Sequence, residues 1–286
     1  MGKLVVVTGG AGFVGSHLCE RLVADGHKVI SLDNYFTGKH ENEVAGVEYR
    51  EGHTKDIATL VPETPDLIYH LGEYSRVAES MNEPGLVWDF NIVGTAAVLE
   101  FCREKKCKIV YAGSSTKFAD ARDDGTAGRD LSPYTWSKAV NTELVRNYGL
   151  WYDVPYAITY FYNVYGPREL SGRYGTVVEI FNQNRKNGEP HKVNAPGTQT
   201  RAYTHVKDTV EALVLIGAEG RGDEYGIGTE DVYSALEVAE LFGGEVLMMP
   251  ARRTSRPSAH VDAEKVKALG WKPSWTLKEY IRSITQ

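Results

Sequence analysis

The stretch Val5 to Leu18 reads VVVTGGAGFVGSHL and joins a short β-branched run to a helical pattern through four glycines. It satisfies both G-x-G-x-x-G and G-x-x-G-x-x-G, so the backbone can turn tightly and approach an anion at the positive end of the helix dipole. Glycine-rich turns between a strand and a helix also occur for packing alone. We expect a phosphate-cradling loop in which five residues contact the ligand: Gly9, Gly12, Phe13, Val14 and Gly15.

Outward from this loop, short β-branched runs alternate with longer amphipathic stretches. Strands are predicted at 4–8, 28–32, 66–71, 108–112 and 156–161, and helices near 13–25, 86–104 and 133–151. The alternation predicts an α/β fold with a doubly wound parallel sheet. After about residue 166 the elements become shorter and richer in Gly, Pro and Arg. We therefore expect a cofactor-binding domain over 1–165 and a smaller C-terminal α/β substrate domain over 166–286, with crossings of the chain between them allowed.

Asp33 directly follows the predicted strand at 28–32. At this distance beyond the glycines, a carboxylate can accept hydrogen bonds from both hydroxyls of an adenosine ribose. The same charge repels a 2′-phosphate, and neither Asn34 nor Tyr35 supplies a cation to bind one. These observations predict NAD rather than NADP as cofactor, with Asp33 and Asn34 beside the ribose. The alternative is that Asp33 only closes a turn at the end of the strand.

The pattern Y-x-x-x-K occurs three times, beginning at Tyr35, Tyr134 and Tyr203. A tyrosine acts as a base near neutral pH only if a cation favours its phenolate, and a lysine four residues later on a helix lies on the same face. Only the second copy has helical context, because SPYTWSK supplies a serine cap and a proline at the first turn. The copies in a glycine-containing loop and in an extended stretch are predicted to be accidental.

The second copy follows the predicted strand at 108–112, and open parallel sheets hold their chemistry at the carboxyl ends of the strands. Ser114 at this end can hydrogen-bond a reacting hydroxyl, with Ser115 and Thr116 beside it, although serines there also serve as simple strand-end caps. We predict Tyr134 as the general base and Ser114 as the residue that positions the substrate hydroxyl. Lys138 would tune the tyrosine and reach the nicotinamide ribose.

Composition argues against several other classes of protein. The 286 residues are 42% hydrophobic with a net charge of −6, and acidic and basic residues are interspersed, so we expect no binding to nucleic acid or to a membrane. Three cysteines are too few for a disulfide framework, and no Cys/His spacing predicts a metal site. The start MGKLVVVTGG does not resemble a signal peptide, and no run has about 18 continuous apolar residues. We expect a cytoplasmic protein.

Together these motifs resemble the extended short-chain dehydrogenase/reductase family, specifically its nucleotide-sugar epimerases and dehydratases of the UDP-glucose 4-epimerase type. Matching segments also include NIVGT at 91–95, YFYNVYGPRE at 160–169 and GTQTRAYTHVKD at 197–208. The resemblance implies a Rossmann-type fold, NAD as cofactor, a nucleotide-diphosphate sugar as substrate and a homodimer. It implies cofactor contacts from Asp56, Ile57, Leu71, Gly72, Asn91, Tyr134, Lys138 and Phe161, and substrate diphosphate contacts from Asn163, Arg201 and Arg252 (or its neighbour Arg253).

Two departures from the family pattern affect the expected reaction. Family dehydratases carry adjacent Asp and Glu after the catalytic hydroxyl residue, whereas this chain has Ser115 and Thr116, neither of which is a competent base unaided. In addition, HLGEYSR at 70–76 places Glu73 and Arg76 near the cofactor, where small and apolar residues are commoner. The two side chains could read the sugar, or they could form an internal ion pair.

Four functions follow as hypotheses. The first is C4 epimerisation of a nucleotide-activated sugar, in which the hydride removed from C4 is returned to the opposite face. A 4-dehydrogenase that releases the keto sugar shares every motif, and a 4,6-dehydratase would need a displaced carboxylate such as Glu73 or Asp120. From a different class, the chain could be an NAD-sensing binding protein without chemistry.

Overall fold

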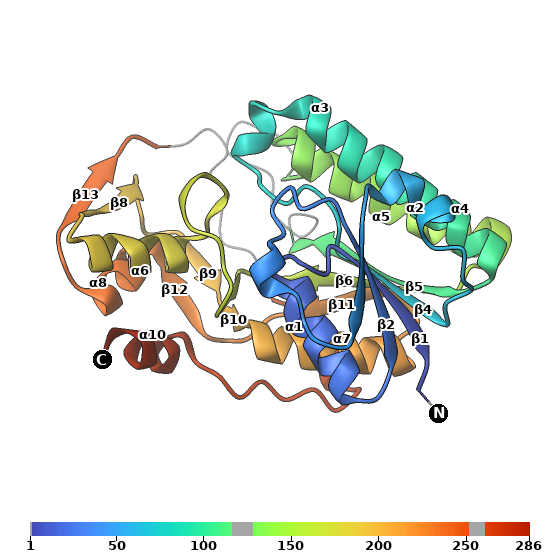
Figure 1. Ribbon diagram of the computed structural model, residues 1–286. Coiled ribbons are helices and arrows are strands. Elements are labelled where there is room, and N and C mark those ends of the chain that lie inside the picture. Colours follow the sequence, from blue (N-terminus) through green and yellow to red (C-terminus); the bar gives the residue numbers. More distant parts are fainter. Residues whose placement is uncertain (1, 116–127, 252–260) are drawn as a thin grey trace.

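Seven parallel strands form one sheet in the order β11-β6-β5-β4-β1-β2-β3 in the computed structural model, which describes residues 2–115, 128–251 and 261–286 (Figure 1). The strand bounds are β1 Leu4–Thr8, β2 Lys28–Asp33, β3 Val47–Glu51, β4 Leu67–His70, β5 Lys108–Ser114, β6 Tyr156–Phe161 and β11 Gly222–Ile227. The chain proceeds from β1 toward β3 on one side and from β4 toward β11 on the other. Strand order therefore reverses between β1 and β4, which is where such sheets bind ligands.

Helices cover both faces of the sheet (Figure 1). On one face lie α1 Phe13–Ala24 and α7 Val206–Glu219, and on the other lie α3 Pro84–Val87, the π-helical turn η4 Trp88–Val93, α4 Gly94–Lys105 and α5 Pro133–Tyr152. Shorter pieces are η1 His40–Asn42, η2 Thr54–Asp56, α2 Ile57–Leu60, η3 Glu79–Met81, η6 Gly128–Asp130 and α9 Glu264–Lys267. The predicted doubly wound α/β fold is confirmed.

The strands are apolar on both sides because each side packs on its own layer of helices. Val5 and Val7 face the α1 and α7 layer, whereas Val6 faces the α4 and α5 layer, so the two hydrophobic cores are separated by the sheet. Edge strand β3 is largely solvated, since none of its five residues is fully buried. This explains why β3 has no apolar signal in the sequence, while the five predicted strands are all present.

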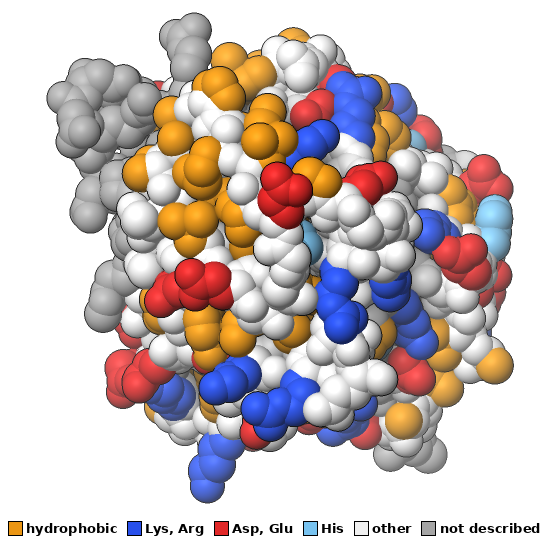
Figure 2. Space-filling model, turned by 90° about the vertical axis from the view of Figure 1, so that its left-hand side faces the viewer, with side chains coloured by type: hydrophobic (Ala, Val, Ile, Leu, Met, Phe, Trp, Pro, Cys, Tyr) orange, Lys and Arg blue, Asp and Glu red, His pale blue; other side chains and the backbone are white. Residues whose placement is uncertain are grey.

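A smaller lobe holds the remaining elements and has its own apolar core (Figure 1). It contains α6 Val177–Asn187, α8 Ala235–Phe242 and α10 Leu277–Thr285, with η7 Gly172–Tyr174 at its entrance. Its short strands pair as β7 Val164–Tyr165 with β10 Thr204–His205, β9 Thr200–Ala202 with β12 Val232–Ser234, and β8 His191–Asn194 with β13 Val246–Met249. Viewed from this side, acidic and basic side chains are mixed and neither forms a continuous field (Figure 2).

The chain crosses between the two parts more than once. After leaving the sheet at residue 161, it enters the small lobe and then returns through α7, which packs on α1, and through β11, which pairs with β6. A single boundary at residue 165 therefore does not fully separate the two parts, because α7 and β11 follow it in the sequence but pack on the part that holds the sheet. Strand β11 has no periodic apolar signal, because GDEYGI contains two glycines and two acidic residues.

By length and composition alone, the 22-residue helical run Pro84–Lys105 could cross a membrane. In the structure this run comprises α3, η4 and α4, and it packs against α5, β4 and β5. Its buried apolar residues Val98, Leu99 and Phe101 belong to the hydrophobic core on this face of the sheet.

Candidate active site

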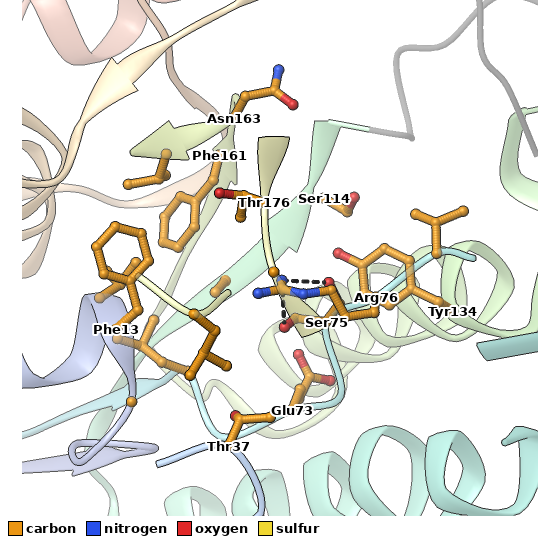
Figure 3. Close-up of a pocket in the computed structure, with 18 of the residues that line it drawn as sticks. Phe13, Thr37, Glu73, Ser75, Arg76, Ser114, Tyr134, Phe161, Asn163 and Thr176 are labelled. Carbon is orange, nitrogen blue, oxygen red and sulfur yellow. Dashed lines mark hydrogen bonds between the residues drawn. The ribbon is translucent and has the colours of Figure 1, made fainter. Parts of the chain in front are cut away.

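A cavity of about 660 Å³ lies between the carboxyl ends of the strands and the small lobe. It is lined both by residues of the glycine loop and by residues of the small lobe (Figure 3). The predicted site residues in this lining are Gly9, Gly12, Phe13, Val14, Gly15, Asp33, Asn34, Leu71, Gly72, Glu73, Arg76, Ser114, Ser115, Tyr134, Lys138, Phe161, Asn163 and Arg201. Thr116, Arg252, Arg253 and Asp120 lie outside the described residues.

The glycine loop forms a cradle that leaves no space for side chains. A Cβ at Gly15 would lie 2.0 Å from the Gly9 carbonyl oxygen, and one at Gly9 would lie 3.0 Å from the Cα of Gly72. Gly9 also has a φ of +74°, which favours glycine. Among the described residues no side chain caps the start of α1 at Gly12, so the first amides of the helix can face an anion. This cradle fits the pyrophosphate of a dinucleotide.

Asp33 ends β2 with its carboxylate at the cavity. One oxygen accepts a hydrogen bond from the Ala11 amide at 2.9 Å and the other from the Tyr35 amide at 2.8 Å. Burial raises the pKa of this carboxyl, although both amides act in the opposite direction. Asp33 therefore has the turn-closing role and also faces the cavity, where ribose hydroxyls would supply further donors to its charged form. Glycine at position 38 leaves room for a ribose beside the Asp33 carboxylate, because a Cβ there would lie 2.8 Å from a carboxylate oxygen.

Three predicted cofactor residues lie outside the cavity lining. Ile57 is fully buried in the core on the α4 side, and Asp56 precedes it at the start of α2. Asn91 is also fully buried, and its amide bonds to the backbone of Tyr74 and to the hydroxyl of Ser137. In this structure Asn91 therefore ties the loop after β4 to α5.

Tyr134 and Lys138 occupy the first two turns of α5 and line the cavity together with Ser114 at the end of β5. The helix starts where the sequence predicts, with Ser132 accepting a hydrogen bond from the Thr135 amide and Pro133 in the first turn. Because the two residues are four apart, their side chains share one face of the helix. The fold thus places the phenol, the ammonium and the serine at one end of the cavity.

The other two Y-x-x-x-K copies lack this geometry. Tyr35 has a φ of +53° in a loop and donates a hydrogen bond to Glu43, while Lys39 pairs with Glu41. Tyr203 precedes α7 and lies between two short strands. The prediction that both are accidental is consistent with these positions, since neither pair shares a helix.

Lys138 is held from two directions inside the protein. Its ammonium donates to the Ala112 carbonyl at 2.7 Å and pairs with the carboxylate of Glu73. Arg76, by contrast, donates to the backbone carbonyls of Ser75 and Tyr174. The alternative of a Glu73–Arg76 ion pair is therefore wrong, because the Glu73 carboxylate pairs with Lys138. Arg76 extends across the cavity (Figure 3).

The small lobe brings cationic and polar groups to the opposite end of the cavity. Burial lowers the pKa of Arg201 on β9, so its guanidinium would gain from an anionic ligand. Burial also lowers the pKa of Arg76, which belongs to the loop after β4 and interacts electrostatically with Tyr134. Asn163 adopts a φ of +27°, which asparagine tolerates better than most residues, and donates to the Ala202 carbonyl at 2.9 Å. This end of the cavity suits a diphosphate.

Sequence reasoning expected the residues that read the nucleotide base around 174–193, but it named no individual residue at the start of α6. Thr176 is the residue before the helix, and its hydroxyl is buried with no hydrogen-bond partner among the described residues. Thr176 and Val177 both line the cavity (Figure 3). The pattern of a threonine before a helical run was readable in the sequence, but only the tertiary structure shows that the helix starts at the cavity.

Comparison with known proteins identifies the family. The NAD dependent epimerase/dehydratase family matches residues 5–228. The chain belongs to this family. It is 30% identical to a putative UDP-glucose 4-epimerase of Methanocaldococcus jannaschii, over 98% of this chain and 97% of that protein. It is 32% identical to a UDP-N-acetyl-alpha-D-glucosaminuronate decarboxylase of Bacillus cytotoxicus, over 84% and 79% respectively.

The fold and the cofactor agree with this assignment. The structure of UDP-glucose 4-epimerase from Thermus thermophilus in complex with NAD superposes with a TM-score of 0.89 at 30% identity, covering 99% of this chain and 97% of that one. The chain is therefore an NAD-dependent enzyme of the extended short-chain dehydrogenase/reductase type, and the predicted family, fold and cofactor are confirmed. Because the relatives include both epimerases and decarboxylases, the reaction needs a separate argument.

Proposed function

We propose that this enzyme interconverts the C4 epimers of a nucleotide-activated hexose or a related sugar. The observation that carries the proposal is the convergence of Tyr134, Lys138 and Ser114 at one end of a cavity whose other parts suit NAD and a diphosphate. A polar residue, Ser115, stands where a dehydratase would have the first of its two acids. The site therefore has groups for moving a proton and a hydride at C4 and lacks the first dehydration acid.

The chain's own residues would act in the following way. Ser114 orients the sugar hydroxyl toward Tyr134, and the phenolate of Tyr134 removes its proton. The glycine loop and Asp33 would hold NAD, which would supply the hydride acceptor and donor for C4. Lys138 stabilises the phenolate and holds the nicotinamide ribose. Epimerisation requires the 4-keto sugar to stay in the cavity and present its other face before the hydride returns.

The competing reactions make different demands on the site. A 4,6-dehydratase would need a carboxylate in contact with the sugar, but the side chain of Glu73 is 1% exposed and paired with Lys138. A 4-dehydrogenase would use the same residues and differ only in releasing the keto sugar. An NAD-sensing protein would have no use for the tyrosine and lysine pair. The use of each of these groups favours the epimerase over the dehydratase and the NAD sensor, and the fate of the keto sugar separates it from the dehydrogenase.

Incubation with a panel of UDP-, GDP-, dTDP- and CDP-sugars tests the reaction. We expect two C4 epimers to interconvert in at least one case, with products identified by NMR and with no net change in nicotinamide absorbance. A released keto sugar together with free NADH would contradict epimerisation and establish the dehydrogenase. A 4-keto-6-deoxy product would establish the dehydratase.

The predicted homodimer has a candidate surface on the helices that cover one face of the sheet. Trp88 and Trp136 are each 40% exposed, and their rings meet edge to face at 5.6 Å beside the 49% exposed Val93. Together with Ile92 they line an apolar hollow. We propose that a second copy of the chain covers this surface, because exposing it in a monomer is unfavourable.

Trp136→Glu should convert the dimer into a monomer, because the charge would be buried against the apolar surface of the second copy. Light scattering coupled to size-exclusion chromatography measures the mass of the particle directly. We expect the mass of the Trp136 variant to be half that of the wild type. Leu247→Glu is a matched control, since Leu247 is 44% exposed on β13 of the small lobe. An unchanged mass for the Trp136 variant would exclude this surface as the interface.

A further inference from the structure

Glu73 is a buried carboxylate directly beside the catalytic lysine. It lies in the loop after β4, and its side chain is 1% exposed. One oxygen accepts hydrogen bonds from the hydroxyl of Thr95 at 2.8 Å, the amide of Asn141 at 2.9 Å and the hydroxyl of Tyr111 at 3.2 Å. The other oxygen pairs with Lys138. Donors from α4, α5 and β5 thus converge on this one carboxylate.

We propose that Glu73 is a positioning residue of this active site, which fixes the ammonium of Lys138 and offsets part of its charge at Tyr134. The inference rests on the proposed roles of Tyr134 and Lys138 and changes the role expected for Glu73. A carboxylate whose two oxygens are engaged by protein groups is poorly placed to read a sugar hydroxyl. Its donors are instead arranged to hold it under the lysine.

The first part of the argument is geometric. A lysine side chain has a flexible four-carbon stem, and its ammonium takes one position only if several acceptors specify it. Here the Ala112 carbonyl and the Glu73 carboxylate lie on β5 and on the loop after β4, two elements of the central sheet region. Glu73 is in turn fixed by Thr95 and Asn141. The lysine is therefore held in place by groups of the protein itself.

The second part is electrostatic. Besides Lys138, the titratable groups around this carboxylate are Tyr111 on β5 and His70 on β4, which connects to it through the Thr95 hydroxyl. Burial lowers the pKa of His70 to about 4 and raises the pKa of Tyr111, so both are uncharged at neutral pH. Arg76 and Tyr134 line the same cavity as Lys138, and the Arg76 guanidinium interacts electrostatically with Tyr134. Tyr134 therefore lies near a lysine that is already paired with Glu73. This pair stabilises the phenolate of Tyr134 less than a lone ammonium would.

Glu73→Gln tests this charge balance without requiring a sugar substrate. In NAD-saturated enzyme, phenolate absorbance is followed against pH, and the same titration of Tyr134→Phe is subtracted to isolate the contribution of Tyr134. Because the amide keeps the shape but removes the negative charge, we expect the Tyr134 titration to move to lower pH by about one unit. A titration that superposes on the wild type would overturn the proposal.

Two further variants separate charge from structure. Glu73→Asp keeps the negative charge and should leave the midpoint of the Tyr134 titration within a few tenths of a pH unit of the wild type. Glu73→Ala removes the charge as Glu73→Gln does, and it replaces that variant if the glutamine protein does not fold by circular dichroism. If Asp and Ala shifted the midpoint equally, a packing role would replace the electrostatic one.

Steady-state kinetics with a nucleotide sugar that the enzyme converts then distinguish a positioning role of Glu73 from a role in substrate recognition. Positioning predicts that Glu73→Gln lowers kcat roughly tenfold or more, moves the acid limb of the kcat profile to lower pH, and changes KM less than about threefold. A rise in KM alone, with the phenolate titration unmoved, would assign Glu73 to sugar recognition. If no nucleotide sugar is turned over but the titration moves as expected, the proposed reaction fails while the inference on Glu73 stands.

Discussion

Tyr134→Phe is expected to lower kcat by about three orders of magnitude, because it removes the hydroxyl that we propose exchanges a proton with the sugar. The ring remains, and so do the start of α5 and the glycine cradle, so NAD should stay bound. Turnover of the C4 epimers and the NAD content of the purified protein measure the two properties separately. The expected result is full NAD occupancy with almost no epimerisation.

Tyr35→Phe supplies a matched control. Tyr35 begins another Y-x-x-x-K pattern, but its hydroxyl bonds to Glu43 in a partly exposed loop and lies outside the cavity lining. Its loss should leave kcat within about twofold of the wild type, as expected of a surface change. If Tyr134→Phe retained wild-type turnover, the catalytic assignment would fall, and an NAD-sensing role would gain support.

Gly15→Ala should abolish stable NAD binding. The new Cβ would lie 2.0 Å from the carbonyl oxygen of Gly9, a backbone atom, so the loop must move away from the shape that receives the pyrophosphate. Alanine is the better helix former by about 1 kcal/mol, but the displacement outweighs this gain. We expect the Kd for NAD to rise at least about a hundredfold and Tm to fall, measured by calorimetric titration and thermal melting.

Gly85→Ala is the control for this substitution. Gly85 also lies in a helix, α3, but a Cβ there would meet nothing within 4 Å. Without a clash the helix propensity dominates, so stability should rise by up to about 1 kcal/mol while NAD affinity stays unchanged. Wild-type NAD affinity in Gly15→Ala would mean that the cradle does not bind the pyrophosphate as described.

The cradle and the proposed catalytic residues lie in the same region of the sheet for a topological reason. The cradle follows β1, and the loop carrying Glu73 follows β4, its immediate neighbour. Ser114 ends β5, the next strand. Since all seven strands are parallel, the carboxyl ends of these three strands lie at the same end of the sheet. The cofactor cradle therefore adjoins the proposed catalytic residues.

The sequence predicted those parts of the candidate site that are formed by residues close together along the chain. The glycine loop, the acid at the end of β2, and the tyrosine and lysine one helical turn apart are each defined within a few positions, so spacing alone was informative. The start of α5 was predicted correctly because a serine cap and a proline at the first turn act locally. Edge strand β3 and strand β11 were missed because neither is an apolar run.

The sequence by itself determined the class of fold, the cofactor and the identity of the proposed catalytic pair, since these rest on short-range backbone and side-chain geometry. Only the tertiary structure decided the partner of Glu73, because Lys138 is 65 positions away and meets it only when α5 packs against β5, the neighbour of β4. The same applies to Thr176, which the small lobe carries to the cavity. A buried charge is stabilised by groups that packing brings together, and spacing along the chain does not reveal them.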